Sequence, residues 1–201
     1  MANRIANLTY GGAARRSCAT SSTANDGAVP CRVVIAGFTC RGCGQRHEGL
    51  PFAYGSTAPA YWREDLAEDE RSVLEDEICI VRAEHYFVRA RLVIPVLDAD
   101  EDFEWGVWAS LSRDSFRRMA EVWSTPGRER EPAYFGWLST ELPTYPTATL
   151  NLKTHVHTEP IGTRPHVILE PTSHPLAVEQ RTGITVHRVH EIAELLSQPP
   201  T

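Results

Sequence analysis

The sequence of 201 residues is poor in lysine and methionine and has no long apolar run. Lys153 is its single lysine among 20 basic residues, a bias that fits a GC-rich coding sequence better than a functional demand for arginine. No window approaches 18 consecutive apolar residues, which excludes a transmembrane helix. The Gly-x-Gly-x-x-Gly, P-loop, Gly-x-Ser-x-Gly and His-Glu-x-x-His motifs are absent, so the sequence indicates no phosphate-binding loop, nucleophile elbow or zinc-protease helix.

The charges are mostly acidic, and the cysteines are odd in number. Twenty Lys and Arg stand against 26 Asp and Glu, a net charge of −6. This balance argues against a protein that binds nucleic acid by neutralising phosphates. Five cysteines cannot all pair within one chain, so a disulfide framework is not expected. We expect a cytoplasmic protein that binds neither nucleic acid nor membranes; its oligomeric state does not follow from composition.

Residues 1–36 differ in composition from the rest of the chain. Four arginines and one aspartate give them a net charge of +3, which leaves −9 on residues 37–201. Small and polar residues without apolar periodicity cannot bury enough surface to offset the entropy of ordering, so we expect a disordered tail. Arg15-Arg16 is not followed by the apolar stretch of an export signal. Residues 37–201 are expected to form one domain, long enough to bury a hydrophobic core.

Alternating apolar and polar residues predict several strands. The two longest runs, residues 86–96 and 103–111, are joined by a short acidic link and are expected to form an antiparallel hairpin. Further strands are expected over 78–81, 150–157 and 167–169.

Three helices are predicted from apolar spacing and terminal signals. The first begins after Ser112, which suits an N-cap, and ends before Pro126. The second runs from Pro175 to just before Gly183, and the third ends before Pro199. Strands with interspersed single helices indicate an α+β fold with a mostly antiparallel sheet, a few short helices and an N-terminal Cys-x-x-Cys knuckle.

The knuckle carries the sharpest chemical signal. Cys40 and Cys43 are separated by two residues, and Gly44 allows the tight backbone turn that presents both sulfurs to one Zn²⁺. A structural zinc needs four ligands, and His47 and Cys79 are our candidates for the other two. Reduced structural cysteines remain an alternative, as does a redox pair, although the glycines make a poor start for the helix that a redox motif requires. Cys79 itself is read as a buried apolar residue, a zinc ligand or a nucleophile that needs a histidine partner.

Three histidines are weaker candidates. His155 and His157 lie on one face of a predicted strand, a spacing that also occurs in two-histidine metal sites, but Asn151, Lys153 and Glu159 on the same face indicate a solvated surface. His174 precedes Pro175 at a helix start, where an imidazole usually caps or packs.

The acidic and aromatic residues have structural and functional interpretations. The aromatics are interpreted as core and rim of the sheet, with a ligand platform as the alternative; they are Trp105, Trp108, Tyr134, Phe135 and Trp137. The acidic run is interpreted as a solvated face, with a surface for a basic partner as the alternative; its members are Glu64, Asp65, Glu68, Asp69, Glu70, Glu75, Asp76 and Glu77.

Several phrases carry a family resemblance, in order along the chain. They are Phe38-x-Cys40-x-x-Cys43-Gly44-x-x-His47 with Leu50-Pro51, Asp76-x-x-Cys79, Phe87-Val88-Arg89, Trp105-Gly106-Val107-Trp108-x-Ser110-Leu111-Ser112, Tyr134-Phe135-Gly136-Trp137-Leu138, Leu150-Asn151-Leu152-Lys153-Thr154 and His174-Pro175-Leu176-Ala177-x-Glu179-Gln180. Together they resemble the bacterial family called domain of unknown function 2199, over about residues 38–195. The resemblance implies a small bacterial protein and no particular activity. It places the four zinc candidates within family phrases, which favours a shared metal.

Three functions from different classes follow. The leading one is a non-enzymatic, zinc-stabilised binding module. The second is an immunity-like or antitoxin-like protein whose acidic surface binds a basic enzyme. The third is an enzyme that uses Cys79 or a histidine-based site, which requires those groups to converge in one pocket.

Overall fold

The computed structural model describes residues 5–7, 38–39, 46–47 and 49–197, the first three ranges by their backbone alone. Its strands are β1 (Ile5–Asn7), β2 (Phe38–Thr39), β3 (Arg46–His47), β4 (Ala53–Ser56), β5 (Val73–Leu74), β6 (Ile78–Val81), β7 (His85–Ile94), β8 (Phe103–Leu111), β9 (Tyr134–Leu138), β10 (Lys153–His157) and β11 (His166–Leu169). Its helices are α1 (Arg113–Val122), α2 (Pro175–Thr182) and α3 (Val186–Leu196), with short 3₁₀ helices η1 (Glu64–Glu68) and η2 (Arg128–Arg130).

The long hairpin predicted from alternation is the spine of the fold. Strands β7 and β8 pair antiparallel without interruption, from Tyr86 opposite Leu111 to Ile94 opposite Phe103. The apolar sides of the two strands face the same way, and Phe103, Trp105 and Leu92 are completely buried. The period-two pattern thus determined both the strands and the face that enters the core.

Five strands close into a barrel. The order is β8-β9-β10-β11-β7, and the ring closes because β7 pairs with both β11 and β8. The α+β class is confirmed, but the expectation of a mostly antiparallel sheet needs correction, because the sheet is mixed. Strand β11 runs parallel to β7, and β4 runs parallel to β8. Both parallel pairs join strands far apart in sequence, which local patterns do not reveal.

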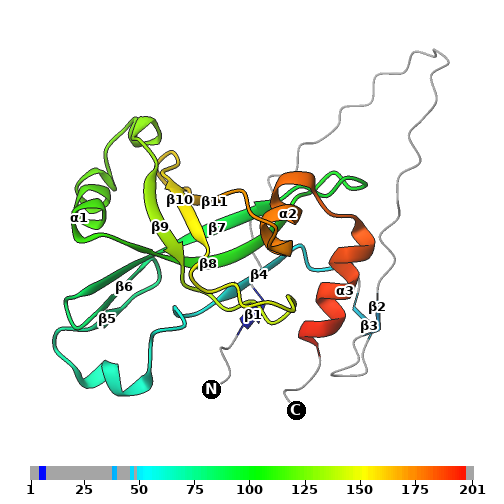
Figure 1. The fold of residues 1–201 in the computed structure, drawn as a ribbon, viewed down its shortest axis with the longest axis horizontal. Helices are drawn as coiled ribbons and strands as arrows, with labels where there is room; N and C mark the ends of the chain where they lie inside the picture. The colour runs from blue at the N-terminus through cyan, green and yellow to red at the C-terminus, as the bar shows by residue number, and fades with distance from the viewer. Residues whose placement is uncertain (1–4, 8–37, 40–45, 48, 198–201) are drawn as a thin grey trace.

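The remaining strands of the large sheet extend its two sides. Strand β4 lies along the first half of β8 and carries β1 on its outer edge. Strand β6 lies along the first half of β7 and carries β5. Figure 1 shows β5, β6 and α1 at one end of the molecule and α2 and α3 at the other.

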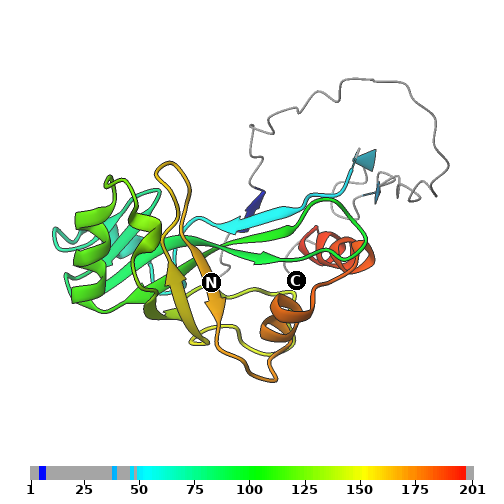
Figure 2. The same cartoon turned by 90° about the horizontal axis from the view of Figure 1, so that it is seen from above.

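The three helices begin and end close to the predicted signals. Ser112 caps α1 by accepting a hydrogen bond from the Ser115 amide at 3.2 Å. Pro175 opens α2, and Gly183 ends it with a φ of 79°. In Figure 2, α2 and α3 lie together beside one end of the β-sheet, where Leu176, Val189 and Ile192 are buried.

Two hydrophobic clusters lie on opposite sides of the hairpin. The larger fills the barrel and continues under α2 and α3. The smaller contains Cys79, Phe87, Trp108 and Leu66, and lies under η1 and β5. Trp105 and Trp108 are therefore both core residues, on opposite faces of β8, as the interpretation of the aromatics anticipated.

Several boundaries differ from the prediction or lie outside the described residues. The strand expected over 150–157 begins at Lys153, because Asn151 takes a turn conformation with a φ of 62°. The predicted tail of residues 1–36 and the Cys-x-x-Cys of the knuckle lie outside the described residues, except that Ile5–Asn7 form β1. Among the helices described, none has the length and apolar character needed to cross a membrane.

Candidate functional site

Helix α1 forms one wall of an apolar groove. Its stabilising cap and the apolar spacing of Phe116, Met119 and Trp123 direct one face toward the sheet. Met119 is buried at 2% exposure, and the ring of Phe116 lies 5.2 Å from that of Tyr86 on β7. Phe116 and Trp123 are only half-buried, so the helix does not close completely onto the strands.

The groove opens between α1 and the residues that lead into β6, and has a volume of about 770 Å³. This lies within the range of roughly 300–1,000 Å³ that is usual for ligand sites. Six apolar residues form its floor and helix wall, namely Ile78, Val88, Phe116, Met119, Ala120 and Trp123. Three consecutive acidic residues form the opposite lip, namely Glu75, Asp76 and Glu77. We call this the α1–β6 groove.

The three acidic residues of the lip differ in their partners. Glu77 is neutralised by Arg164, whose Nε lies 2.8 and 2.9 Å from the two carboxylate oxygens and whose Nη2 lies 2.6 Å from Oε1. Glu75 and Asp76 are exposed, and within the described part of the chain no cationic side chain lies within 4.0 Å of them. Two carboxylates that form no ion pair within the described part of the chain therefore lie beside an apolar surface.

The backbone of the lip is fixed by strand β7. The Arg89 amide donates to the Glu77 carbonyl at 2.9 Å, and the Arg89 guanidinium reaches the Asp76 carbonyl at 3.4 Å. Arg89 is 8% exposed, and its guanidinium lies 5.9 Å from the Trp108 ring centre. Because these contacts hold the main chain, the lip is a preformed feature rather than a loose loop.

A buried arginine holds the loop that supplies Arg164. Arg128 is 3% exposed and donates from Nε to the Glu159 carbonyl at 2.6 Å, and from Nη2 to the Thr163 carbonyl at 2.8 Å. A smaller hollow of about 260 Å³ lies here and shares Glu77 and Trp123 with the groove. The sequence predicted a role for neither arginine, because no local pattern marks an arginine whose partners lie in a distant segment.

Only part of the predicted zinc site lies within the described residues. Cys40 and Cys43 lie outside the described residues, and His47 lies in β3, opposite Phe38 of β2. Cys79 is completely buried, and burial raises the pKa of its thiol to about 12. A thiol with that pKa keeps its proton at neutral pH and is a poor nucleophile. Among residues 49–197 and the short strands before them, no three metal-ligating side chains cluster.

The candidate histidines occupy two different environments. His155 and His157 lie on the outer face of β10, as predicted from alternation, and the ring of His157 stacks on that of His166 at 4.9 Å. His174 caps α2: its Nδ1 accepts from the Leu176 amide at 3.1 Å. The expectation that His174 caps or packs is therefore confirmed.

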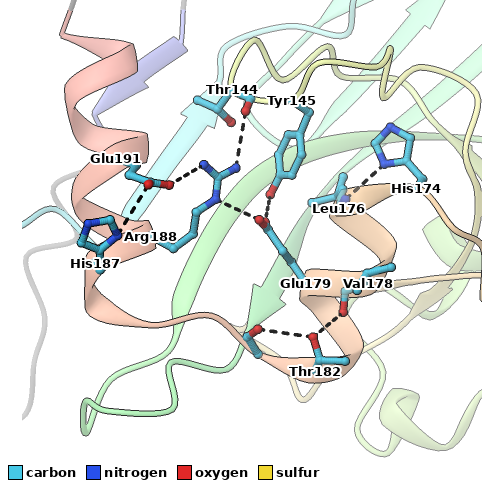
Figure 3. Close-up of polar contacts among 11 residues, drawn as sticks. Thr144, Tyr145, His174, Leu176, Val178, Glu179, Thr182, His187, Arg188 and Glu191 are labelled. Carbon is cyan, nitrogen blue, oxygen red and sulfur yellow. Dashed lines mark hydrogen bonds and ion pairs between the residues drawn. The ribbon is translucent and has the colours of Figure 1, made fainter.

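A second polar cluster joins the loop after β9 to α2 and α3 (Figure 3). The Tyr145 hydroxyl donates to Glu179 at 2.5 Å, and Arg188 donates from Nε to the same carboxylate at 2.9 Å. Arg188 also binds Glu191 at 3.1 Å. Burial, together with the negative charge of Glu179, raises the pKa of Tyr145 above its usual range. Because these groups satisfy one another, the cluster acts as a brace between elements.

Comparison with known proteins gives one match. A family model described as "Uncharacterized protein conserved in bacteria (DUF2199)" matches residues 39–184, a range that includes the whole α1–β6 groove and Arg164. No curated protein and no solved structure matches the chain.

Proposed function

The chain belongs to the DUF2199 family of bacterial proteins, and we propose that it is an interaction module that binds a basic protein through the α1–β6 groove. The observation that carries the proposal is an apolar floor beside two carboxylates, Glu75 and Asp76, that have no ion-pair partner among the described residues. The partner segment that fits is apolar on the side that enters the groove and carries Lys or Arg beside it.

Each half of the groove contributes a different part of recognition. Burying one large apolar side chain contributes about 1.5–3 kcal/mol, so the floor supplies affinity. The carboxylates of Glu75 and Asp76 attract a cationic segment and orient it, mainly by raising the association rate. Phe116 and Trp123, which are only half-buried, offer aromatic contacts of the kind enriched at interfaces.

The residues that line the α1–β6 groove support a binding role better than a catalytic one. The described lining of the groove contains no serine, cysteine or histidine that could act as nucleophile or imidazole base. Cys79, the nucleophile suggested by the sequence, lies within the smaller hydrophobic cluster. A site based on Cys79 therefore lacks support.

The acidic lip also favours a second candidate function. An immunity-like protein that inhibits a basic enzyme would use the same surface. The immunity-like protein and the general interaction module predict different observations. The gene of an immunity-like protein lies beside that of its target enzyme, and the protein suppresses the activity of that enzyme. A general interaction module is expected to show neither property.

The test uses a fluorescent model peptide of about 14 residues, with Leu at helical spacing on one face and Lys beside it. We expect binding with a Kd on the order of 10 µM, measured by fluorescence anisotropy. The double substitution Glu75→Lys with Asp76→Lys is expected to weaken binding about tenfold. Ala120→Arg, which fills the groove from α1 without breaking the helix, is expected to abolish it.

A matched control separates the groove from general attraction. Glu68→Lys with Glu70→Lys changes the net charge equally at two exposed positions outside the groove, and should weaken binding less than about twofold. Equal weakening by both pairs, or no binding of the peptide at all, would contradict the proposal. A peptide with Gly in place of Leu should bind poorly, because the apolar contribution is then missing.

We also propose that one Zn²⁺ stabilises the segment before β4, bound by Cys40 and Cys43 and completed by His47 and Cys79. This rests on the Cys-x-x-Cys spacing. The complete burial of Cys79 requires any shared metal to lie against the apolar cluster.

Elemental analysis of the purified chain tests the zinc proposal. We expect one zinc per chain, and its loss in a variant with both Cys40→Ser and Cys43→Ser. Cys79→Ala decides the fourth ligand: retention of zinc would make Cys79 a packing residue alone. A wild-type chain that is folded and metal-free would refute the zinc site and leave the groove proposal intact.

A further inference from the structure

The outer face of β9, β10 and β11 combines exposed rings with paired charges. The register places its side chains in three rows across the strands, Trp137-Lys153-Glu170, Phe135-His155-Ile168 and His157-His166. We call this the β9–β11 face. It lies on the outside of the barrel, and none of these residues lines the α1–β6 groove.

Large apolar side chains on this face remain uncovered. Phe135, Trp137 and Ile168 are 44%, 39% and 46% exposed. The rings form a continuous surface, because Phe135 lies 5.4 Å from Trp137 and 5.9 Å from His155. A contiguous apolar patch rimmed by polar groups is the usual mark of an interaction surface.

Each carboxylate of the face lies close to a basic side chain. Glu170 lies 3.9 Å from Lys153 and 3.5 Å from His155, and Glu159 lies 2.6 Å from His166. Lys153 and Glu170 are permanent charges of opposite sign, and they lie at the same level of two neighbouring strands. A second copy of this face, turned so that the two strands exchange places, brings each of these charges opposite its complement.

We infer that a second copy of this chain binds here, face to face, in a two-fold symmetric dimer. A two-fold axis along the seam between β10 and β11 exchanges these strands. Lys153 of one protomer then lies opposite Glu170 of the other, and His157 opposite His166. Ile168 lies against His155 and next to Phe135 of the other protomer, so the exposed apolar groups are covered.

The geometry makes the dimer sensitive to acid. His157 faces His155 on its own strand, His166 on β11 and Glu159 beyond the end of β10. Burial, and then the neighbouring His166 and His155, lower its pKa below the usual value. Dimer contact would add the imidazole rings of the other protomer, so protonation of His157 opposes association.

Sedimentation velocity of the full chain tests the inference. We expect a dimer at about pH 7.5, and a dissociation constant of the dimer that is at least about tenfold higher at about pH 5.5. Ile168→Glu should give a folded monomer at both pH values. Ile161→Glu places the same charge at a position that is 54% exposed and lies outside the face, and should leave the dimer unchanged.

A charge-swap mixture separates contact between protomers from contact within one chain. Lys153→Glu and Glu170→Lys should each be monomeric alone, because like charges then meet across the axis. An equimolar mixture of the two variants should dimerise, since every facing pair is again opposite in sign.

A wild-type chain that is monomeric at about 100 µM and pH 7.5, or a mixture that fails to associate, would overturn the inference. Equal disruption by Ile161→Glu would overturn it as well. The peptide-binding test of the groove does not depend on this outcome.

Discussion

At the scale of single residues, Arg128 shows how a charge is accommodated without a carboxylate. Its guanidinium donates to the backbone carbonyls of Trp123, Glu159, Pro160 and Thr163, and lies 4.6 Å from the centre of the Trp123 ring. Carbonyl dipoles and the ring face together replace the water that burial removes. The planar fork of arginine matches several acceptors at once, which a lysine cannot do.

We expect Arg128→Met to destabilise the fold by about 3 kcal/mol, because it leaves buried carbonyls without donors. Arg128→Lys should cost nearly as much, since one ammonium cannot reach the same set. Urea unfolding followed by tryptophan fluorescence measures both. Arg130→Met, at an exposed position in the same 3₁₀ helix, should change stability by less than about 0.5 kcal/mol. Similar small effects for all three variants would contradict this interpretation of the arginine.

The sequence predicted the environment of Cys79 but not the roles of the two arginines near the groove. Cys79 was correctly recognised as a possible buried apolar residue, because a cysteine between isoleucines in a strand is typical of a core. Arg164 and Arg128 could not be recognised, since partners of each lie far away in sequence: Glu77 for Arg164 and residues 159–163 for Arg128. The Arg164 side chain lies 87 positions from Glu77 in sequence and within 2.6 Å in space.

At the scale of elements, strong local periodicity predicted the spine and all three helices. Strand β9 was not predicted, because Phe135 and Trp137 are apolar residues on its outer face and hide the alternation. Strand β4 is four residues long and contains Gly55, so its pattern is too short to detect. The parallel pairing of β11 with β7 closes the barrel, whereas that of β4 with β8 extends the sheet beside it; both join strands far apart in sequence, which local patterns do not reveal.

Helix α1 illustrates why an apolar helix face does not by itself locate a site. Its spacing predicted packing on the sheet, and Met119 is buried as expected. Phe116 and Trp123 flank Met119 on the same face but remain half-exposed, because the lip of residues 75–77 stands away from the helix. A sequence specifies which side chains face inward; whether they are fully covered depends on the element opposite.

At the scale of the whole molecule, the dependence of stability on pH has contributions from carboxylates and from a histidine. Asp65 and Asp69 have a pKa below the usual value, through Arg63 and the Arg71 amide respectively. The Arg118 side chain likewise lowers the pKa of Glu131. Their contribution is present above a pH of about 4 and is lost as the pH falls through their folded values. Burial, His166 and His155 lower the pKa of His157, so its contribution is lost first, as the pH falls below about 6.5.

We therefore expect the urea midpoint of the monomer to fall in two steps on acidification, one below about pH 6.5 and one below about pH 4. The measurement uses Ile168→Gln, so that neither dissociation of a dimer nor an added charge beside His155 contributes. Adding His157→Gln should remove the first step and leave the second, because glutamine carries no proton to gain and the carboxylates are unchanged. A first step that survives His157→Gln would assign it to another group and contradict the role given to this histidine. A single step below about pH 4 in the parent variant would mean that the stacked imidazoles accept protons as readily in the folded chain as in the unfolded one.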